Sequence, residues 1–257
     1  MKHLANKRQF LRWSLASVGG LMVAGCDRIA QTSWFPKVLA AGESLNHGAQ
    51  KILLSRKAMA EEFTEADLSP DFRSNGTDNP NSPTYQAMVK NSFADWSLVI
   101  DGLVEKPLKL SLAELHAMPS RTQITRHDCV EGWSAIGKWK GVPLQQILAM
   151  ARPTPTAQFA VFHCADPMES DGSSLYYESI DLDDATHPQT ILAYELNGTI
   201  LPVANGAPLR LRVERQLGYK QAKYLMRIEL VDSFAHIAGG KGGYWEDSNG
   251  YQWFAGI

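Results

Sequence analysis

Short strand-like segments separated by turn signals fill the second half of the chain and constrain its fold more than any other feature. Residues 159–162 are apolar throughout, and apolar residues alternate with polar ones from 209 to 213. Another strand is expected at 224–231, and the dipeptide Asn197-Gly198 predicts a tight hairpin within residues 193–201. This pattern predicts a sheet-rich domain in which neighbouring strands run mainly antiparallel.

Helices are expected between some of these strands. After expected strands at 97–100 and 108–110, Ser111 and Glu114 have the spacing of a capping box, which predicts a short helix. A second helix is expected from about Val142 to Ala151, with Pro143 in its first turn. The sequence has no internal repeat and therefore predicts an α+β fold with mixed, largely antiparallel sheets.

The first 25 residues differ in charge from the rest of the chain. They carry four bases and no acid, followed by a short apolar run, as a targeting signal does. The remainder has 21 bases against 27 acids, a net charge of about −6, which argues against nucleic-acid binding. We therefore expect an export signal at 1–25, an N-terminal arm or linker at 26–84 and a folded domain at 85–257.

Two export signals overlap in this N-terminal segment. The run from Asn6 to Arg12 resembles a twin-arginine signal in which Lys7 replaces the first arginine before Arg8. The sequence Val-Ala-Gly-Cys ending at Cys26 resembles a lipoprotein cleavage box and suggests a possible lipid anchor. The alternative is a cleaved signal in which Cys26 has no role. A lipoprotein box and a cleaved signal both predict a periplasmic protein. The lipoprotein box additionally predicts anchoring to the inner membrane.

The three cysteines are too few for a disulfide framework. Cys129 follows Arg126 and His127, whose charges favour the metal-binding thiolate, although Asp128 opposes them. No CxxC or HExxH motif accompanies it, so a zinc site is not indicated. The alternative is a disulfide between Cys129 and Cys164, which would make the chain a lipid-anchored binding module with a basic pocket for an anion.

Three motifs in order resemble the sulfite oxidase family, in its bacterial periplasmic protein-methionine-sulfoxide-reductase-like branch. The first is the Arg-x-x-Cys-Val-Glu-x-Trp-Ser run at 126–134, which implies that Cys129 is the molybdenum ligand and catalytic residue. The stretch at 201–210 is similar to the pterin-binding stretch of that family, and Gly-Tyr-Lys-Gln-Ala-Lys at 218–223 resembles its following loop. The likeness covers about residues 72–231 and implies a sulfite-oxidase-type molybdopterin-binding domain.

The resemblance also implies which residues hold the cofactor. Molybdopterin carries a phosphate on a polar ring system, so its site needs cations and hydrogen-bond donors. The implied cofactor-binding residues are Asn75, Arg126, Cys164, Asn205, Arg210, Lys220, Gln221, Ala222 and Lys223. Among these, the two lysines and Arg210 would supply charge. The aromatic residues from Tyr244 to Phe254 are expected to pack on the domain, or alternatively to cover the pocket.

A molybdopterin enzyme of this family transfers an oxygen atom to or from a small oxo-compound such as a sulfoxide or sulfite. We therefore expect a small-molecule oxo-substrate and a separate electron-transfer partner, either a membrane or a haem protein. Only 26 residues follow Val231, too few for the second domain that many sulfite oxidases use to dimerise, so a monomer is expected. Molybdenum analysis separates this enzyme from the binding module, which needs none.

Overall fold

The computed structural model describes residues 32–35, 37–38, 41–42, 45, 48, 58–169 and 171–257. Contacts divide the chain into two compact units, Met1–Ser55 and Arg56–Ile257. The first unit is described at a few positions only, and the predicted signals at Lys7-Arg8 and Cys26 lie outside the described residues. Residues 58–84, expected as part of an arm, belong to the second unit. Among the described residues, no helix is long and apolar enough to cross a membrane.

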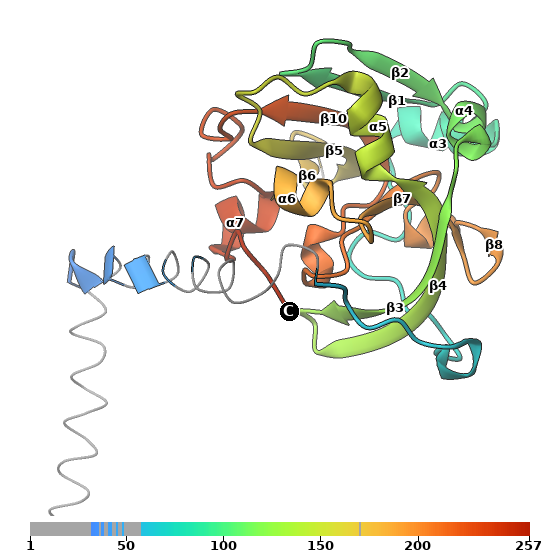
Figure 1. Ribbon diagram of the computed structural model, residues 1–257, viewed down its shortest axis with the longest axis horizontal. Helices are drawn as coiled ribbons and strands as arrows, with labels where there is room; N and C mark the ends of the chain where they lie inside the picture. Colours follow the sequence, from blue (N-terminus) through green and yellow to red (C-terminus); the bar gives the residue numbers. More distant parts are fainter. Residues whose placement is uncertain are drawn as a thin grey trace, which may run out of the picture. The chain divides into compact units, whose positions relative to one another are not determined.

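The second unit contains two sheets, one mixed and one antiparallel (Figure 1). The first has the strand order β2-β1-β10-β5-β6, formed by Leu108–Ser111, Ser97–Gly102, Leu225–Val231, Phe159–Pro167 and Leu175–Asp181. Strand β1 pairs in parallel with β10, and every other pair in this sheet is antiparallel. The predicted α+β fold with mixed, largely antiparallel sheets is therefore confirmed.

The second sheet is built on a long hairpin that the sequence patterns did not reveal. Its order is β3-β4-β7-β8, formed by Arg121–Cys129, Trp133–Pro143, Ile191–Leu196 and Thr199–Ile200, and β9 (Arg210–Arg212) pairs with β7. The expected hairpin turn at Asn197-Gly198 is confirmed, since both residues have positive φ as a tight hairpin requires. The apolar faces of both sheets contribute to one large core.

Short helices connect the strands. They are η1 (Glu65–Asp67), α3 (Pro83–Lys90), α4 (Leu112–Ala117), α5 (Leu144–Ala151), α6 (Leu182–Ala185), η2 (Val203–Asn205), η3 (Gly218–Lys220) and α7 (Tyr244–Asn249). The predicted capping box starts α4, where the Ser111 hydroxyl accepts from the Glu114 amide at 3.3 Å. Helix α5 begins two residues later than expected, because Val142 and Pro143 still belong to β4.

Residues 58–84 pack against the second sheet. The Phe63 amide donates to the Ile124 carbonyl at 2.8 Å, and the Ala60 amide donates to the Gln189 side chain at 2.7 Å. Phe72 is buried in a second core cluster with Trp139. This packing fixes the segment that follows Phe72, and that segment forms one wall of the site described next.

Candidate active site

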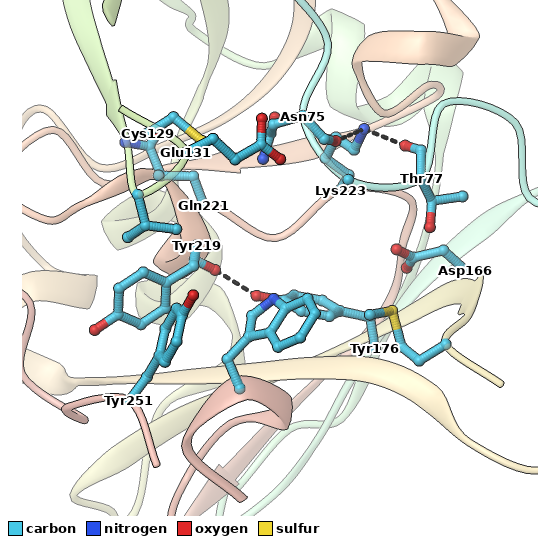
Figure 2. A pocket seen from close by; sticks show the side chains of 15 residues that line it. Asn75, Thr77, Cys129, Glu131, Asp166, Tyr176, Tyr219, Gln221, Lys223 and Tyr251 are labelled. Atoms are coloured by element: carbon cyan, nitrogen blue, oxygen red, sulfur yellow. Dashed lines mark hydrogen bonds between the residues drawn. The ribbon is translucent and has the colours of Figure 1, made fainter. Parts of the chain in front are cut away.

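A pocket of about 200 Å³ lies where stretches far apart in the sequence meet (Figure 2). Its walls include residues 75–77, the turn after β3 at 129–131, Asp166 and Tyr176 from the β5–β6 region, Gln221 and Lys223 after η3, and Trp245 and Tyr251. Several of the sequence-predicted residues therefore come together. Asn75, Cys129, Gln221 and Lys223 all line this pocket.

Cys129 is the last residue of β3 and is half-buried at the pocket wall. Gly132 closes the turn with a φ of 85°, and its amide donates to the Cys129 carbonyl at 3.0 Å. Burial raises the pKa of the Cys129 thiol, and the Glu131 carboxylate adds to this, while Arg73 and neighbouring amides oppose it. A bound metal ion would reverse the balance, because a coordinating thiol is deprotonated.

The residues beside Cys129 do not promote its thiolate as the sequence suggested. Arg126 projects from the opposite face of β3, is mostly exposed and pairs with the Asp128 carboxylate at 3.0 Å. His127 is fully buried, and burial together with Arg212 and Arg210 holds its pKa well below the usual value. His127 is therefore neutral. The expectation that the charges of Arg126 and His127 favour the Cys129 thiolate was wrong.

Cys129 and Cys164 are both free, so the alternative of a disulfide between them is wrong. Cys164 lies in β5 within the large core and does not line the pocket; burial raises the pKa of its thiol well above the usual value. In the described part of the chain, no three His, Cys, Asp or Glu side chains gather as a metal site.

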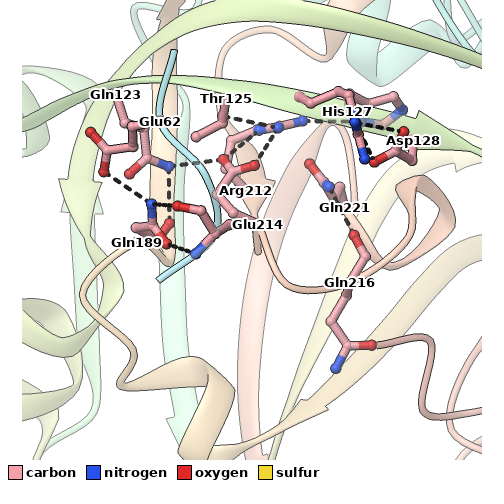
Figure 3. A network of polar contacts seen from close by, with 12 residues as sticks. Glu62, Gln123, Thr125, His127, Asp128, Gln189, Arg212, Glu214, Gln216 and Gln221 are labelled. Atoms are coloured by element: carbon pink, nitrogen blue, oxygen red, sulfur yellow. Dashed lines mark hydrogen bonds and ion pairs between the residues drawn. The ribbon is translucent and has the colours of Figure 1, made fainter. Parts of the chain in front are cut away.

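A buried polar network supports the strand that carries Cys129 (Figure 3). Arg212 donates to both carboxylate oxygens of Glu214, at 3.0 and 2.6 Å, and to His127 Nδ1 at 3.1 Å. Because arginine always donates, His127 Nδ1 must accept, which leaves the hydrogen on Nε2. Gln123 joins the network by donating to Glu214 at 2.8 Å. The network therefore holds the inward face of β3 as far as His127, two residues before Cys129.

Two other buried cations have no carboxylate partner among the described residues, and we call Arg210 and Lys223 the unpaired cations. Arg210 is fully buried and donates to the carbonyls of Asn205 at 2.9 Å and Gln221 at 3.2 Å. Lys223 donates to the carbonyls of Asn75 at 2.7 Å, Ala204 at 2.9 Å and Thr77. Burial lowers the pKa of Arg210 to about 9 and that of Lys223 to about 7.

The surroundings of the unpaired cations fit an anionic, hydrogen-bonding group. In the described structure, the buried Asn205 Nδ2 and Arg210 Nε atoms have no hydrogen-bond partner. Such donors are costly to bury unless a ligand completes them. Gly206, with a φ of 110°, lets the backbone approach Lys223 closely, because a Cβ there would lie 2.9 Å from Lys223 Cβ. A phosphate and polar ring, as in molybdopterin, match these groups.

Lys220, three residues before Lys223, has a different environment. Its ammonium pairs with Glu178 of β6 and, at 2.8 Å, with Glu246 of α7, and all three side chains are buried. Arg212 and Lys220 are therefore the paired cations of the site. Lys220 does not line the pocket, and its pairing anchors α7, which carries the pocket residue Trp245.

The other predicted residues act through their backbone or lie outside the pocket wall. The Asn75 and Gln221 carbonyls accept from the unpaired cations, as given above. Ala222 is buried in the large core, and its carbonyl accepts from the Leu211 amide at 2.8 Å. Arg126 and Cys164 lie outside the pocket lining.

Among the pocket residues, Asp166 and Tyr176 carried no sequence signal. Asp166 and Tyr176 come from β5 and β6, and the Tyr176 hydroxyl donates to the Tyr219 carbonyl at 2.5 Å. Trp245 and Tyr251 show that the aromatic segment both packs on the domain and covers the pocket. Single aromatic or acidic residues within strands are usually structural, so an unaided sequence does not single them out.

Comparisons with known proteins agree with this geometry. Residues 85–236 match the family described as "Oxidoreductase molybdopterin binding domain". The chain is 35% identical over 253 residues to the putative protein-methionine-sulfoxide reductase subunit YedZ1 of Azospira oryzae, covering 98% of this chain and 88% of that protein. It is 34% identical over 242 residues to the protein-methionine-sulfoxide reductase catalytic subunit MsrP of Xanthomonas axonopodis pv. citri, covering 90% and 72%.

A solved structure has a related fold. The sulfane dehydrogenase SoxCD of Paracoccus pantotrophus aligns with a TM-score of 0.50 and 26% identity, over 55% of this chain and 39% of that one. The family match covers more than half of the chain, and the relatives align along most of it. The chain therefore belongs to the molybdopterin-binding oxidoreductases of the sulfite oxidase family and is a molybdenum-dependent enzyme.

Proposed function

We propose that this enzyme reduces a sulfoxide to a thioether, with Cys129 as the protein ligand to molybdenum. The observation that carries the proposal is the half-buried Cys129 thiol in one pocket wall with the unpaired cation Lys223 in another. Relatives named as protein-methionine-sulfoxide reductases support this direction of the reaction. Met168, Trp245 and Tyr251 add apolar lining, which suits a neutral sulfoxide better than the sulfite anion.

In this proposal the cofactor is held by the residues whose polar groups lack partners or face the pocket. Arg210 and Lys223 would hold its phosphate, and Asn205 and Gln221 would hydrogen-bond its polar rings. When bound, the cofactor supplies the two-electron chemistry that moves an oxygen atom. Lys220 would act indirectly, by fixing α7 and the residues that cover the pocket.

Exchange of the thiol tests the metal assignment. Cys129→Ser should abolish turnover and leave the pterin largely bound, because the proposed phosphate anchors lie on other segments. Cys164→Ser is the matched control, since that thiol lies in the core outside the pocket lining, and it should keep both activity and molybdenum. The measurements are turnover of a small sulfoxide, molybdenum by elemental analysis and pterin by fluorescence. A fully active Cys129→Ser enzyme would contradict the assignment.

The N-terminal segment supports a proposal about location. A cofactor held between several segments of a folded domain is best inserted before export, and a twin-arginine signal at Lys7-Arg8 would direct the folded protein to such a route. Acylation of Cys26 would then tether the exported domain, and stable tethering needs more than one lipid chain. We further propose a separate electron-transfer protein, because the relative MsrP is named a catalytic subunit.

A further inference from the structure

Asp166 is a buried pocket carboxyl to which the proposed function gives no role. It lies on β5, is only 5% exposed, and lines the pocket together with Cys129. Figure 2 shows its carboxyl group pointing into the cavity. Its Oδ1 atom has no hydrogen-bond partner in the described structure. An incompletely bonded buried carboxyl costs stability, so its presence needs another explanation.

The surroundings of Asp166 favour its protonated form near neutral pH. Burial raises the pKa of Asp166 to about 7, although Lys223 and a hydrogen bond with the Thr77 side chain partly oppose this. Near pH 7 the protonated and charged forms of Asp166 are therefore both populated, and the group can give up and regain a proton with little cost. The Asp166 charge in turn raises the pKa of four neighbouring groups that are neutral near pH 7, namely Tyr85, Cys164, Tyr176 and Tyr224.

Other ionisable groups of the pocket are less suited to donate a proton. The Tyr176 hydroxyl already donates to the Tyr219 carbonyl, and burial raises its pKa well above the usual value. Lys223 directs its ammonium hydrogens to backbone carbonyls. Glu131 is exposed, and its carboxylate accepts from the Trp133 ring at 2.9 Å.

We infer that Asp166 is a further catalytic residue, which donates a proton to the sulfoxide oxygen as the sulfur–oxygen bond breaks. This inference rests on the proposed sulfoxide reduction. In that reaction the sulfur gains two electrons, which the reduced cofactor supplies, and the oxygen leaves as water after accepting two protons. Asp166 provides the first proton and regains it from solvent, and the second comes from water. General acid catalysis of this kind requires a donor that is protonated at the working pH.

The pH dependence of turnover tests the inference. In the wild type, kcat/KM for a small sulfoxide should fall as the pH rises through about 7, because the protonated form of Asp166 is the active one. Asp166→Asn should lower kcat/KM by roughly 10²–10⁴-fold and remove this fall. Asp166→Glu should restore part of the rate together with a pH-dependent fall. Glu169, an exposed carboxylate three residues away, provides the matched control. Glu169→Gln should change neither kcat/KM nor its dependence on pH.

Two readouts without turnover separate this role from others. The difference between infrared spectra of the cofactor-free wild type and of Asp166→Asn should show a protonated-carboxyl band that disappears above about pH 7, and taking this difference removes the contribution of other buried carboxyls such as Glu178. Molybdenum content should be unchanged in Asp166→Asn. Loss of molybdenum would make Asp166 part of the cofactor site and overturn the inference, as would an unchanged rate or pH profile. The turnover of Cys129→Ser tests the proposed function. The pH profile and the infrared spectra of the Asp166 variants test the role of Asp166.

Discussion

Arg212 and Lys220 differ from Arg210 and Lys223 in their partners, although all four are buried within one region of 14 residues. Arg210 and Arg212 even lie over the same Trp139 ring, at 5.0 and 4.4 Å. The paired cations contact Glu214, Glu178 and Glu246. The unpaired cations contact backbone carbonyls, and among the described residues no carboxylate lies close enough to form an ion pair with them. A buried charge needs a counter-charge. We therefore assign the paired cations to the scaffold, and we expect the unpaired cations to bind an anionic ligand.

The largest effect, on protein stability, is expected when the ion pair of a paired cation is removed. Glu214→Gln leaves Arg212 buried without a counter-charge and should lower the free energy of unfolding by roughly 3–5 kcal/mol. Urea denaturation measures it. Glu105→Gln is the control, because its pair with Arg152 is exposed and should contribute less than about 1 kcal/mol. An equal loss of unfolding free energy in Glu214→Gln and Glu105→Gln would show that burial does not make one ion pair more important for stability than the other.

A smaller effect, on cofactor binding, is expected for the unpaired cations. Lys223→Met and Arg210→Met each remove a charge-assisted contact worth roughly 1.5–3 kcal/mol, so cofactor affinity should fall about 10- to 150-fold. In the cofactor-free variants the removed buried charge favours the fold and the carbonyls left without a donor oppose it, so stability should change less than in a variant of a paired cation. Lys220→Met should instead destabilise the protein, since Glu178 and Glu246 remain buried. Full molybdenum occupancy in both unpaired-cation variants would contradict the comparison.

The smallest effect concerns pH. Burial lowers the pKa of Lys223 to about 7 in the folded, cofactor-free protein, whereas an unfolded lysine titrates near 10.5. Between these values the unfolded chain binds more protons, so the free energy of unfolding should rise with pH, by at most about 1.4 kcal/mol per unit. The difference between wild type and Lys223→Met in urea denaturation from pH 7 to 9 isolates this contribution. A bound phosphate should keep Lys223 protonated and remove the slope.

Local signals were sufficient for several elements of the fold. The capping box at Ser111 and the Asn197-Gly198 turn depend on neighbouring residues, and both are confirmed. The β3–β4 hairpin was missed because the buried face of β4 contains the small residues Ala135 and Gly137, which give little hydrophobic signal. The space beside Gly137 is filled by Phe72, so its role depends on a distant segment.

The same distinction applies to the site. Cys129 and Lys223 lie within motifs and were predicted, and both line the pocket. No local pattern tells Lys223 from Lys220, because the carboxylates that pair with Lys220 are 42 and 26 residues away. Asp166 likewise depends on the approach of segments from across the domain. Sequence patterns could therefore indicate the chemistry of the loop but not which of its cations is free for a ligand.

The parallel pairing of β1 with β10 has a consequence for biosynthesis. Strand β1 ends at Gly102, and its partner begins at Leu225, so more than a hundred residues must be translated before the two can meet. Until then one edge of β1 has no native neighbour, and such long-range pairing is slow to form. The pocket walls span residues 75–251, so they too are incomplete on the ribosome until late. Cofactor insertion must therefore follow translation of nearly the whole domain, and the nascent chain needs protection from aggregation until then.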